Sequence, residues 1–461
     1  MRIFYTTKIT TPSNLNTSHL NTSTLPNMKI FTNPPKETWP ELAQRPQLEL
    51  EFLESAVRNL LNRVKKSGDS ALRELTLQFD KASIQTFLVS KEEIAEAVQS
   101  IPADLQKAIR TAALNIEKFH AAQKRDSPQI ETMAGVSCWR KAVPIDKVGI
   151  YIPGGSAPLF STVLMLGIPA KLAGCREVVL CTPPDPSGKV NAAILFAAQL
   201  VGVKKIFKVG GAQAIGAMAY GTQSIPKVYK IFGPGNQYVT KAKQLVMEDG
   251  LAIDMPAGPS EVLVMADSSA NPSFVASDLL SQAEHGEDSQ VILVVSRASL
   301  IAPIQEEIER QINDLPRKAI AERALVNSRV ILLDSQTDAI DFVNEYAPEH
   351  LIINTRNTDE ISSQITNAGS IFLGNYSPEA IGDYASGTNH TLPTNGYAKA
   401  FAGVALESFM KYITYQRLTE EGISTLGPAV ELMAEAEQLI GHKMAIKVRL
   451  DSLSGWSGLE R

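Results

Sequence analysis

The 461-residue sequence contains few cysteines, no apolar run long enough to cross a bilayer and no large excess of charge of either sign. Its three cysteines, Cys138, Cys175 and Cys181, are too few for a disulfide framework and lack the spacing of a zinc knuckle. A net charge of −5 gives no electrostatic reason to expect nucleic acid or an anionic membrane as a partner. With 44% hydrophobic and 20% charged residues, the composition is that of a globular chain of two or three domains.

The first 36 residues differ from the rest: they hold four basic residues, no acidic residue and many Ser, Thr and Asn. Such a leader is typical of a transit peptide. Met28, which begins MKIF, is an alternative start, and the leader would then lie outside the protein. We expect residues 1–36 to be a low-complexity leader, disordered or transit-like. The expected location is the cytoplasm, or the plastid if the leader is a genuine transit peptide.

Apolar periodicity divides the rest of the chain. Residues 47–125 have apolar residues at three- and four-residue spacing, which predicts helices. Short apolar runs then alternate with helical segments, which predicts parallel sheets covered on both faces. The sequence therefore predicts an α/β fold of two incomplete Rossmann-like, doubly wound parallel-sheet domains with small helical terminal segments. The expected divisions are 37–148 as the helical part of the first α/β domain, 149–259 as the second α/β domain, 260–404 as the remainder of the first and 405–461 as a C-terminal helical segment.

Three glycine-rich turns follow predicted strands, at Gly154–Gly155, Gly210–Gly211 and Gly233–Asn236. Backbone amides at such turns bind phosphate groups, and a helix N-terminus favours their charge. The third turn begins like a dinucleotide fingerprint, but Tyr238 occupies the position of the last glycine, and any tight strand-to-helix turn needs glycine. Three such turns in succession, with Gln213 and Asn236 beside them, favour a non-standard dinucleotide site.

The segment LLSQAEHGED, at 279–288, places Gln282 and His285 on one face of a predicted helix. Two interpretations are open. A histidine just before Gly286 suits an ordinary helix end, whereas the same spacing would let both side chains bind one metal ion. His120, on a charged helix, is expected to be solvated.

Three later histidines lie near carboxylates. The Glu349–His350 pair, just before a predicted strand, offers two proton carriers with different pKa values, although two solvated turn residues are the alternative. Asp383 and His390 belong to a long loop, GDYASGTNHTLPTNG, and loops of that length tend to be functional or mobile. His442 follows Glu437 in the last helical segment. A mixed nitrogen and oxygen set of this kind suits zinc or a similar ion.

Seven blocks carry a resemblance to a known family: GIYIPGGSAPLFSTVLM, VGGAQAIGAMAYGT, KIFGPGN, IDMPAGPSEVLV, DLLSQAEHG, YAPEHL and GTNHTLPT. From about Lys36 to the C-terminus, the sequence resembles histidinol dehydrogenase, the zinc- and NAD-dependent enzyme that completes histidine biosynthesis. The resemblance implies two successive oxidations of L-histidinol, through L-histidinal, to L-histidine, with NAD+ and one Zn2+ per subunit. It also implies a homodimer in which the C-terminal segment 405–461 completes the neighbour's site.

The resemblance also implies roles for individual residues. The implied zinc ligands are Gln282, His285, Asp383 and His442. Glu349 and His350 would be the catalytic acid–base pair, with His350 taking the alcohol proton and Glu349 activating water onto the aldehyde. The implied dinucleotide contacts are Tyr151, Gln213 and Asn236. The implied substrate contacts are the four zinc ligands and His350, together with Ser260, Glu437, His390 and Ser161.

Two rival interpretations remain. A thiol mechanism, as in ordinary aldehyde dehydrogenases, would use one of the three cysteines, but surroundings such as EVVLCTPP predict buried strands. A catalytically inactive relative that serves as a metal-dependent binding module would have lost part of the implied site. It would be expected to lack some of Gln282, His285, Glu349, His350 and Asp383, all of which are present.

Overall fold

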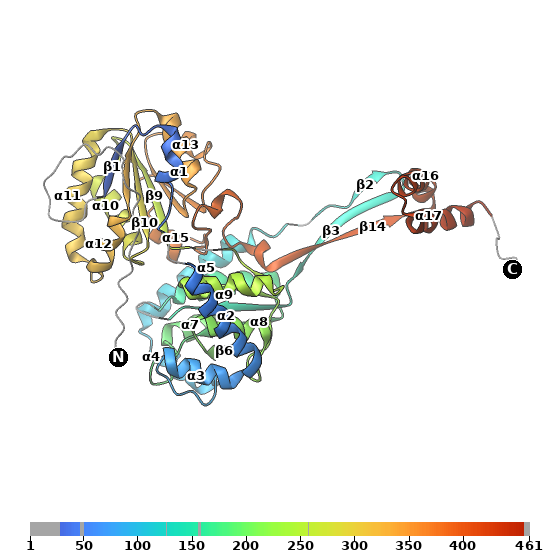
Figure 1. Cartoon of the computed structure of the whole chain (residues 1–461), viewed down its shortest axis with the longest axis horizontal. Coiled ribbons are helices and arrows are strands. Elements are labelled where there is room, and N and C mark those ends of the chain that lie inside the picture. The colour runs from blue at the N-terminus through green and yellow to red at the C-terminus, as the bar shows by residue number, and fades with distance from the viewer. Residues whose placement is uncertain (1–27, 47–49, 126, 155–157, 257, 456–461) are drawn as a thin grey trace.

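The computed structural model describes residues 28–46, 50–125, 127–154, 158–256 and 258–455. Two α/β domains lie side by side, and a long arm that ends in two helices projects from them (Figure 1). No helix within these ranges is long and apolar enough to cross a membrane. Most of the predicted leader, up to residue 27, lies outside the described residues.

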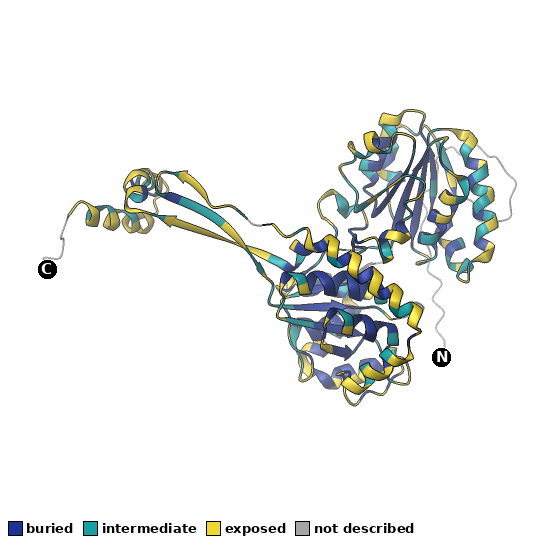
Figure 2. Ribbon diagram, turned by 180° about the vertical axis from the view of Figure 1, so that it is seen from behind, coloured by how far each residue is buried: buried dark blue, intermediate teal, exposed yellow. Residues whose placement is uncertain are grey.

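The larger sheet has six parallel strands. In spatial order they are β1 (Lys29–Thr32), β11 (Arg329–Leu332), β10 (Gln290–Val295), β9 (Glu261–Ala266), β12 (His350–Asn354) and β13 (Ser370–Leu373). One face packs on α10 (Pro272–Ala283), α11 (Ile301–Gln311) and α12 (Lys318–Val326). The other packs on α1 (Trp39–Leu42), α13 (Gln336–Tyr346) and α14 (Thr358–Ser362). Because both faces are covered, β9, β10 and β12 are buried at every residue (Figure 2), which explains their continuous apolar sequences.

The smaller sheet has five parallel strands. In spatial order they are β6 (Lys205–Lys208), β5 (Glu177–Thr182), β4 (Lys147–Tyr151), β7 (Lys230–Phe232) and β8 (Ala252–Ile253). The helices that connect them are α6 (Phe160–Ala173), α7 (Ala192–Val201), α8 (Gly211–Tyr220) and α9 (Gln237–Glu248). Apart from β1, which lies at one edge of the larger sheet, the chain enters each sheet in its middle, at β4 or at β9. Later strands are added first on one side and then on the other, so the strand order reverses between β4 and β7 and between β9 and β12. Each sheet thus has the strand order of a Rossmann fold without its sixth strand, so the predicted fold class is confirmed.

The predicted domain divisions need two corrections. Within 37–148, the short helix α1 packs on the six-stranded sheet. The longer helices α2 (Leu50–Ser67), α3 (Asp69–Phe79), α4 (Lys91–Ser100) and α5 (Ala103–Ala121) pack instead on the five-stranded domain, not on the first α/β domain. The sequence predicts the apolar faces of these helices from their periodicity, but it does not predict which domain packs against those faces. The leader also ends earlier than residue 36, because β1 pairs with β11 and Met28 is buried.

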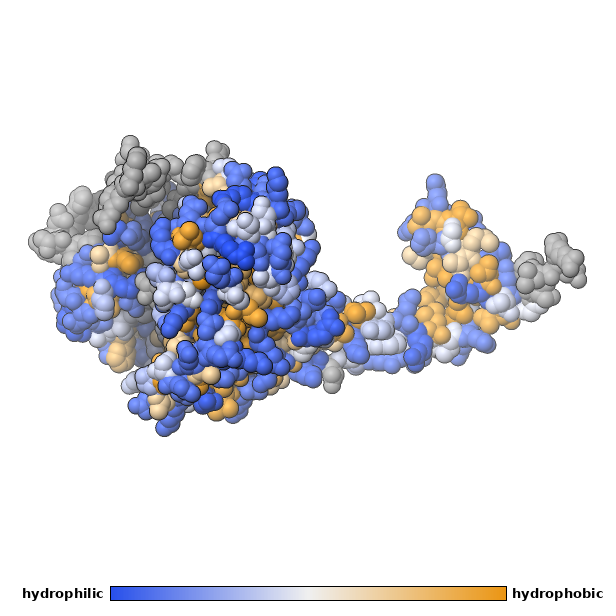
Figure 3. Space-filling model, turned by 90° about the horizontal axis from the view of Figure 1, so that it is seen from below, coloured by the Kyte–Doolittle hydropathy of each residue, from blue (hydrophilic) through white to orange (hydrophobic). Residues whose placement is uncertain are grey.

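The arm is a twisted antiparallel ribbon. It is built from β2 (Ile130–Met133), β3 (Val136–Pro144) and β14 (Met410–Leu418), and it carries α16 (Glu420–Ala436) and α17 (Ile440–Leu453) at its end. The segment 405–461 was predicted to be helical, and β14 corrects this: all nine of its residues pair with β3. Apolar side chains gather at the arm's end (Figure 3), and the strongly exposed ones are Leu432, Met433, Ile440 and Val448.

Candidate active site

Glu349 and His350 lie where β12 begins, beside the first residue of β9. The Glu349 carboxylate accepts a hydrogen bond from the backbone N–H of Glu261, with 2.9 Å between Oε2 and N. His350 Nδ1 lies 3.2 Å from the Glu261 carbonyl oxygen and 3.7 Å from Glu349 Oε2. Only 7% of Glu349 and 3% of His350 is exposed, so they are not two solvated turn residues.

Burial and mutual charge shift the pKa values of this pair. Burial raises the pKa of Glu349, His350 offsets part of that rise, and the net pKa is about 8. For His350, burial alone would lower the pKa, but the carboxylates of Glu349 and Asp383 outweigh it and the net pKa is raised well above its usual value. A carboxyl group that titrates near neutral pH can act as a general base or acid there.

Three of the four predicted metal ligands come from the larger domain. Gln282 is buried in the last turn of α10, and Asp383 lies on α15 (Glu379–Tyr384), with its Oδ1 3.2 Å from His350 Nε2. His285 was predicted to lie on this helix, but it lies in the turn after it. Its backbone N–H donates to the Gln282 carbonyl at 3.2 Å. An amide oxygen, an imidazole nitrogen and a carboxylate are donors that zinc accepts, and three protein donors leave positions open.

The fourth predicted ligand is elsewhere. His442 is exposed on α17, and Glu437 is exposed where α16 ends, at the far end of the arm from α10 and α15 (Figure 1). In the part of the chain that the structure describes, no three His, Cys, Asp or Glu side chains are arranged to hold a metal ion. A single chain therefore assembles only part of the predicted zinc site.

The predicted substrate contacts lie on both domains. Ser260 directly precedes β9 and is half-buried, while Ser161 is buried in the first turn of α6. The next residue on α6, Thr162, places its Oγ1 2.9 Å from His390 Nε2, and His390 Nδ1 lies 2.8 Å from the Asp383 carbonyl oxygen. His390 thus links the smaller domain to the helix that carries Asp383.

The predicted dinucleotide contacts share one cavity. A cavity of about 830 Å³ is lined by Tyr151, Gln213 and Asn236, at the carboxyl end of the smaller sheet where the strand order reverses. The Tyr151 hydroxyl accepts a hydrogen bond from the N–H of Gly211 at 2.9 Å, and the Asn236 side chain caps α9. Crevices at such reversal points bind nucleotides in open α/β sheets. Of the predicted turns, Gly155 lies outside the described residues.

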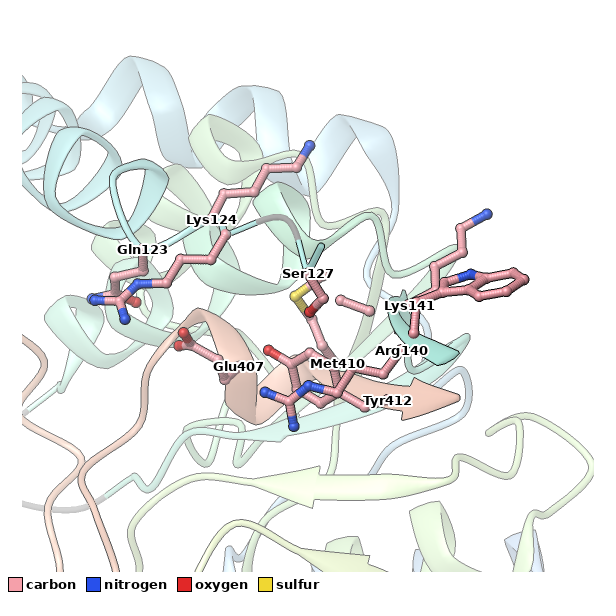
Figure 4. Close-up of a pocket in the computed structure, with 11 residues that line it drawn as sticks. Gln123, Lys124, Ser127, Arg140, Lys141, Glu407, Met410 and Tyr412 are labelled. Atoms are coloured by element: carbon pink, nitrogen blue, oxygen red, sulfur yellow. The ribbon is translucent and has the colours of Figure 1, made fainter. Parts of the chain in front are cut away.

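A second cavity, of about 350 Å³, lies at the base of the arm (Figure 4). It is lined mainly by basic and aromatic side chains, including Lys124, Arg140, Lys141 and Tyr412. None of the predicted catalytic, metal or dinucleotide residues lines it. It is therefore separate from the candidate active site.

Sequence reasoning missed two buried carboxylates. Glu261 forms a two-point ion pair with Arg45, with 3.0 Å from Nε to Oε1 and 2.7 Å from Nη2 to Oε2, and its backbone contacts both Glu349 and His350. Glu379 is buried beside Ser281. Arg45 and Glu261 are 216 positions apart, and no local pattern marks either carboxylate.

The structure also corrects the predicted surroundings of His120 and of two cysteines. His120, expected to be solvated, is fully buried, with its Nδ1 2.9 Å from the Ile116 carbonyl oxygen. Of the cysteines, Cys181 is buried in β5, whereas Cys138 and Cys175 are half-buried. Burial raises the pKa of the Cys175 thiol to about 12, and it also raises that of Cys181, so both thiols stay protonated near neutral pH.

The family profile and the relatives of more than 50% identity described next share one name. The family profile described as histidinol dehydrogenase matches residues 43–450. A histidinol dehydrogenase of Bacteroides fragilis (strain YCH46) is 59% identical over 426 residues, which cover 92% of this chain and 100% of that protein. The histidinol dehydrogenase of Escherichia coli (strain K12) is 52% identical over 90% of this chain and 95% of its own. The crystal structure of histidinol dehydrogenase from Elizabethkingia anophelis matches with a TM-score of 0.91 and 57% identity, covering 93% of this chain and 99% of that one.

Proposed function

The chain belongs to the histidinol dehydrogenase family, and from this premise we propose that it oxidises L-histidinol through L-histidinal to L-histidine in two NAD+-linked steps, at a site that holds one zinc ion. The observation that carries the proposal is the buried pair Glu349 and His350, with the half-buried Asp383 against His350 and the buried Gln282 nearby. Proton carriers and oxygen and nitrogen donors from three separate elements meet there.

The geometry supports a division of work between the acid–base pair. Because His350 Nδ1 faces the Glu261 carbonyl, Nε2 is the atom that exchanges a proton with the substrate, once the proton that it shares with Asp383 has left. In the first oxidation Nε2 takes the alcohol proton while hydride leaves the same substrate carbon for the nicotinamide. In the second, the Glu349 carboxylate takes a proton from water as the water oxygen adds to the aldehyde carbon. The hydrated aldehyde then loses hydride to a second NAD+.

Gln282, His285 and Asp383 would hold the zinc ion, with His442 of the partner subunit as the fourth ligand. When bound, the ion supplies orientation of the substrate's imidazole and amine, which fixes the reacting carbon. Ser260, Ser161, His390 and the partner subunit's Glu437 would complete the substrate pocket. Tyr151, Gln213 and Asn236 would contact the dinucleotide in the 830 Å³ cavity.

We propose a homodimer because the arm carries two needed residues away from their own site. Its end exposes Leu432, Met433 and Ile440, an apolar surface suited to burial against a second copy. The bacterial sources of the relatives favour the cytoplasm over the plastid.

The test is NADH formation by purified protein that has been treated with EDTA and given L-histidinol and NAD+, before and after zinc is added. Two NADH per histidinol, restored by zinc, is the expected result. Full activity after thorough metal removal would refute the zinc site, and no activity with any metal would refute the proposed reaction.

A further inference from the structure

Glu379 is a buried carboxylate that belongs neither to the proposed acid–base pair nor to the lining of the dinucleotide cavity. It begins α15, one helical turn before Asp383, and only 1% of its surface is exposed. Its Oε1 accepts a hydrogen bond from Ser281 Oγ at 2.8 Å, while Oε2 has no hydrogen-bond partner among the described residues. Burying an unsatisfied carboxylate oxygen destabilises the fold, so its presence at this position calls for a functional reason.

The side-chain amide of Gln282 lies against this carboxylate. One orientation satisfies both neighbours: Gln282 Nε2 donates to Glu379 Oε1 at 3.0 Å, and Gln282 Oε1 accepts from the backbone N–H of Glu261 at 3.0 Å. The reverse orientation would place the amide oxygen against a carboxylate oxygen and the amide nitrogen against an N–H. Both contacts would be repulsive, so the carboxylate selects one orientation.

The selected orientation turns the amide oxygen toward the acid–base pair. That oxygen faces the Glu261 N–H, which also donates to Glu349, whereas the amide nitrogen faces Glu379. An amide binds a metal ion through its oxygen, and this oxygen has a second lone pair beyond the one that accepts from Glu261. If the amide were reversed, its NH2 group would face the site and could not act as a ligand.

We infer that Glu379 is a positioning residue that holds the Gln282 amide with its oxygen presented to the metal. The inference rests on the proposed zinc site. In this role, Glu379 acts as a hydrogen-bond acceptor for the Gln282 amide. Its negative charge near the ion is not what the role requires. Partners that orient ligands in this way change metal affinity about 10- to 100-fold when removed.

The experiment measures zinc affinity, not turnover, by competition between the full-length protein and a zinc chelator. Glu379→Leu keeps the volume but removes the acceptor, and its zinc Kd is expected to rise about 10- to 100-fold. Glu379→Gln keeps an acceptor oxygen and is expected to stay close to the unaltered protein. Ser281→Ala, which removes the other donor to Glu379 Oε1, is the matched control and should leave the affinity nearly unchanged.

Unchanged affinity in Glu379→Leu would overturn the inference. Equal loss in Glu379→Leu and Glu379→Gln would overturn it too, because charge and not acceptance would then be what matters. If Glu379→Leu does not fold, a double variant that exchanges the two side chains, Gln282→Glu with Glu379→Gln, tests the inference instead. Gln282→Glu alone sets two carboxylates against each other and should weaken zinc binding, and adding Glu379→Gln should restore part of it. No restoration would refute the inference, while an unaltered protein that binds no zinc would refute the proposed function instead.

Discussion

His350 and Asp383 lie within hydrogen-bonding distance of each other, with 3.2 Å between Nε2 of the ring and Oδ1 of the carboxylate. Nε2 is the atom that the proposed mechanism uses as a base, and Asp383 is also a proposed metal ligand. A carboxylate has two oxygens, so Oδ2 stays free for a ligand role while Oδ1 orients the ring. The contact couples proton transfer to metal binding through one residue.

The acid–base assignment predicts what happens when each proton carrier is replaced by a neutral residue of similar shape. His350→Asn and Glu349→Gln should each lower kcat by about 10²- to 10⁴-fold, because a positioned base contributes about that factor. Zinc content, measured by mass spectrometry of the purified variants, should stay near that of the unaltered protein. Near-normal turnover in both variants would rule out the assignment.

The proposed exchange of arms predicts that two inactive variants can rescue each other. His350→Asn inactivates the part of the site on the two α/β domains, which we call the body, whereas His442→Asn inactivates the part on the arm. In a mixed dimer one site receives an intact body and an intact arm. When equal amounts are unfolded together and refolded, random pairing should restore about a quarter of normal activity, since half the dimers are mixed and each has one good site. If each arm served its own body, the mixture would stay inactive.

The Arg45–Glu261 ion pair is expected to hold the amino end of β9 in place. Its side chains are only 7% and 1% exposed, and Glu261's backbone contacts both members of the acid–base pair. Arg45→Met leaves a buried carboxylate unpaired and should lower the free energy of unfolding by about 3–5 kcal/mol. Urea titration measures this. Lys36→Met, which breaks two ion pairs exposed to solvent, is the control and should change little.

These residues also show how far the sequence predicts the molecule. The two parallel sheets follow from continuous apolar strands, because a strand covered on both faces has no polar alternation. The packing of α2–α5 on the smaller domain could not be predicted, because an amphipathic face does not name its partner. The three predicted dinucleotide contacts meet in one cavity, but Glu261 and Glu379 are set in place by Arg45 and Gln282, which lie far from them in sequence.

A thiol mechanism predicts that activity depends on cysteine, whereas the proposed mechanism does not. Burial raises the pKa of Cys175 to about 12 and also raises that of Cys181, which keeps both as poorly nucleophilic thiols. A variant with Ser or Ala at Cys138, Cys175 and Cys181 should therefore keep near-normal kcat for both oxidations. Loss of the second oxidation alone, with histidinal accumulating, would support a thiol intermediate.

The half-buried carboxyl group of Asp80 should make the free energy of unfolding depend on pH. It lies in the lining of the 830 Å³ cavity, where burial raises its pKa from 3.8 to about 6, and its Oδ2 has no hydrogen-bond partner among the described residues. Because the folded state holds this proton more tightly, its contribution to stability is present below pH 3.8 and is lost as the pH rises through about 6.

Asp80→Asn should therefore stabilise the protein near neutral pH and have much less effect in acid. The shift alone corresponds to ~3 kcal/mol, and because the side chain is partly exposed to solvent we expect about 1 kcal/mol at pH 7.5. Urea titrations of both proteins without NAD+, at pH 5 and pH 7.5, measure the difference. A gain that is equal at both values, or larger at pH 5, would show that the carboxylate is not destabilised by its burial.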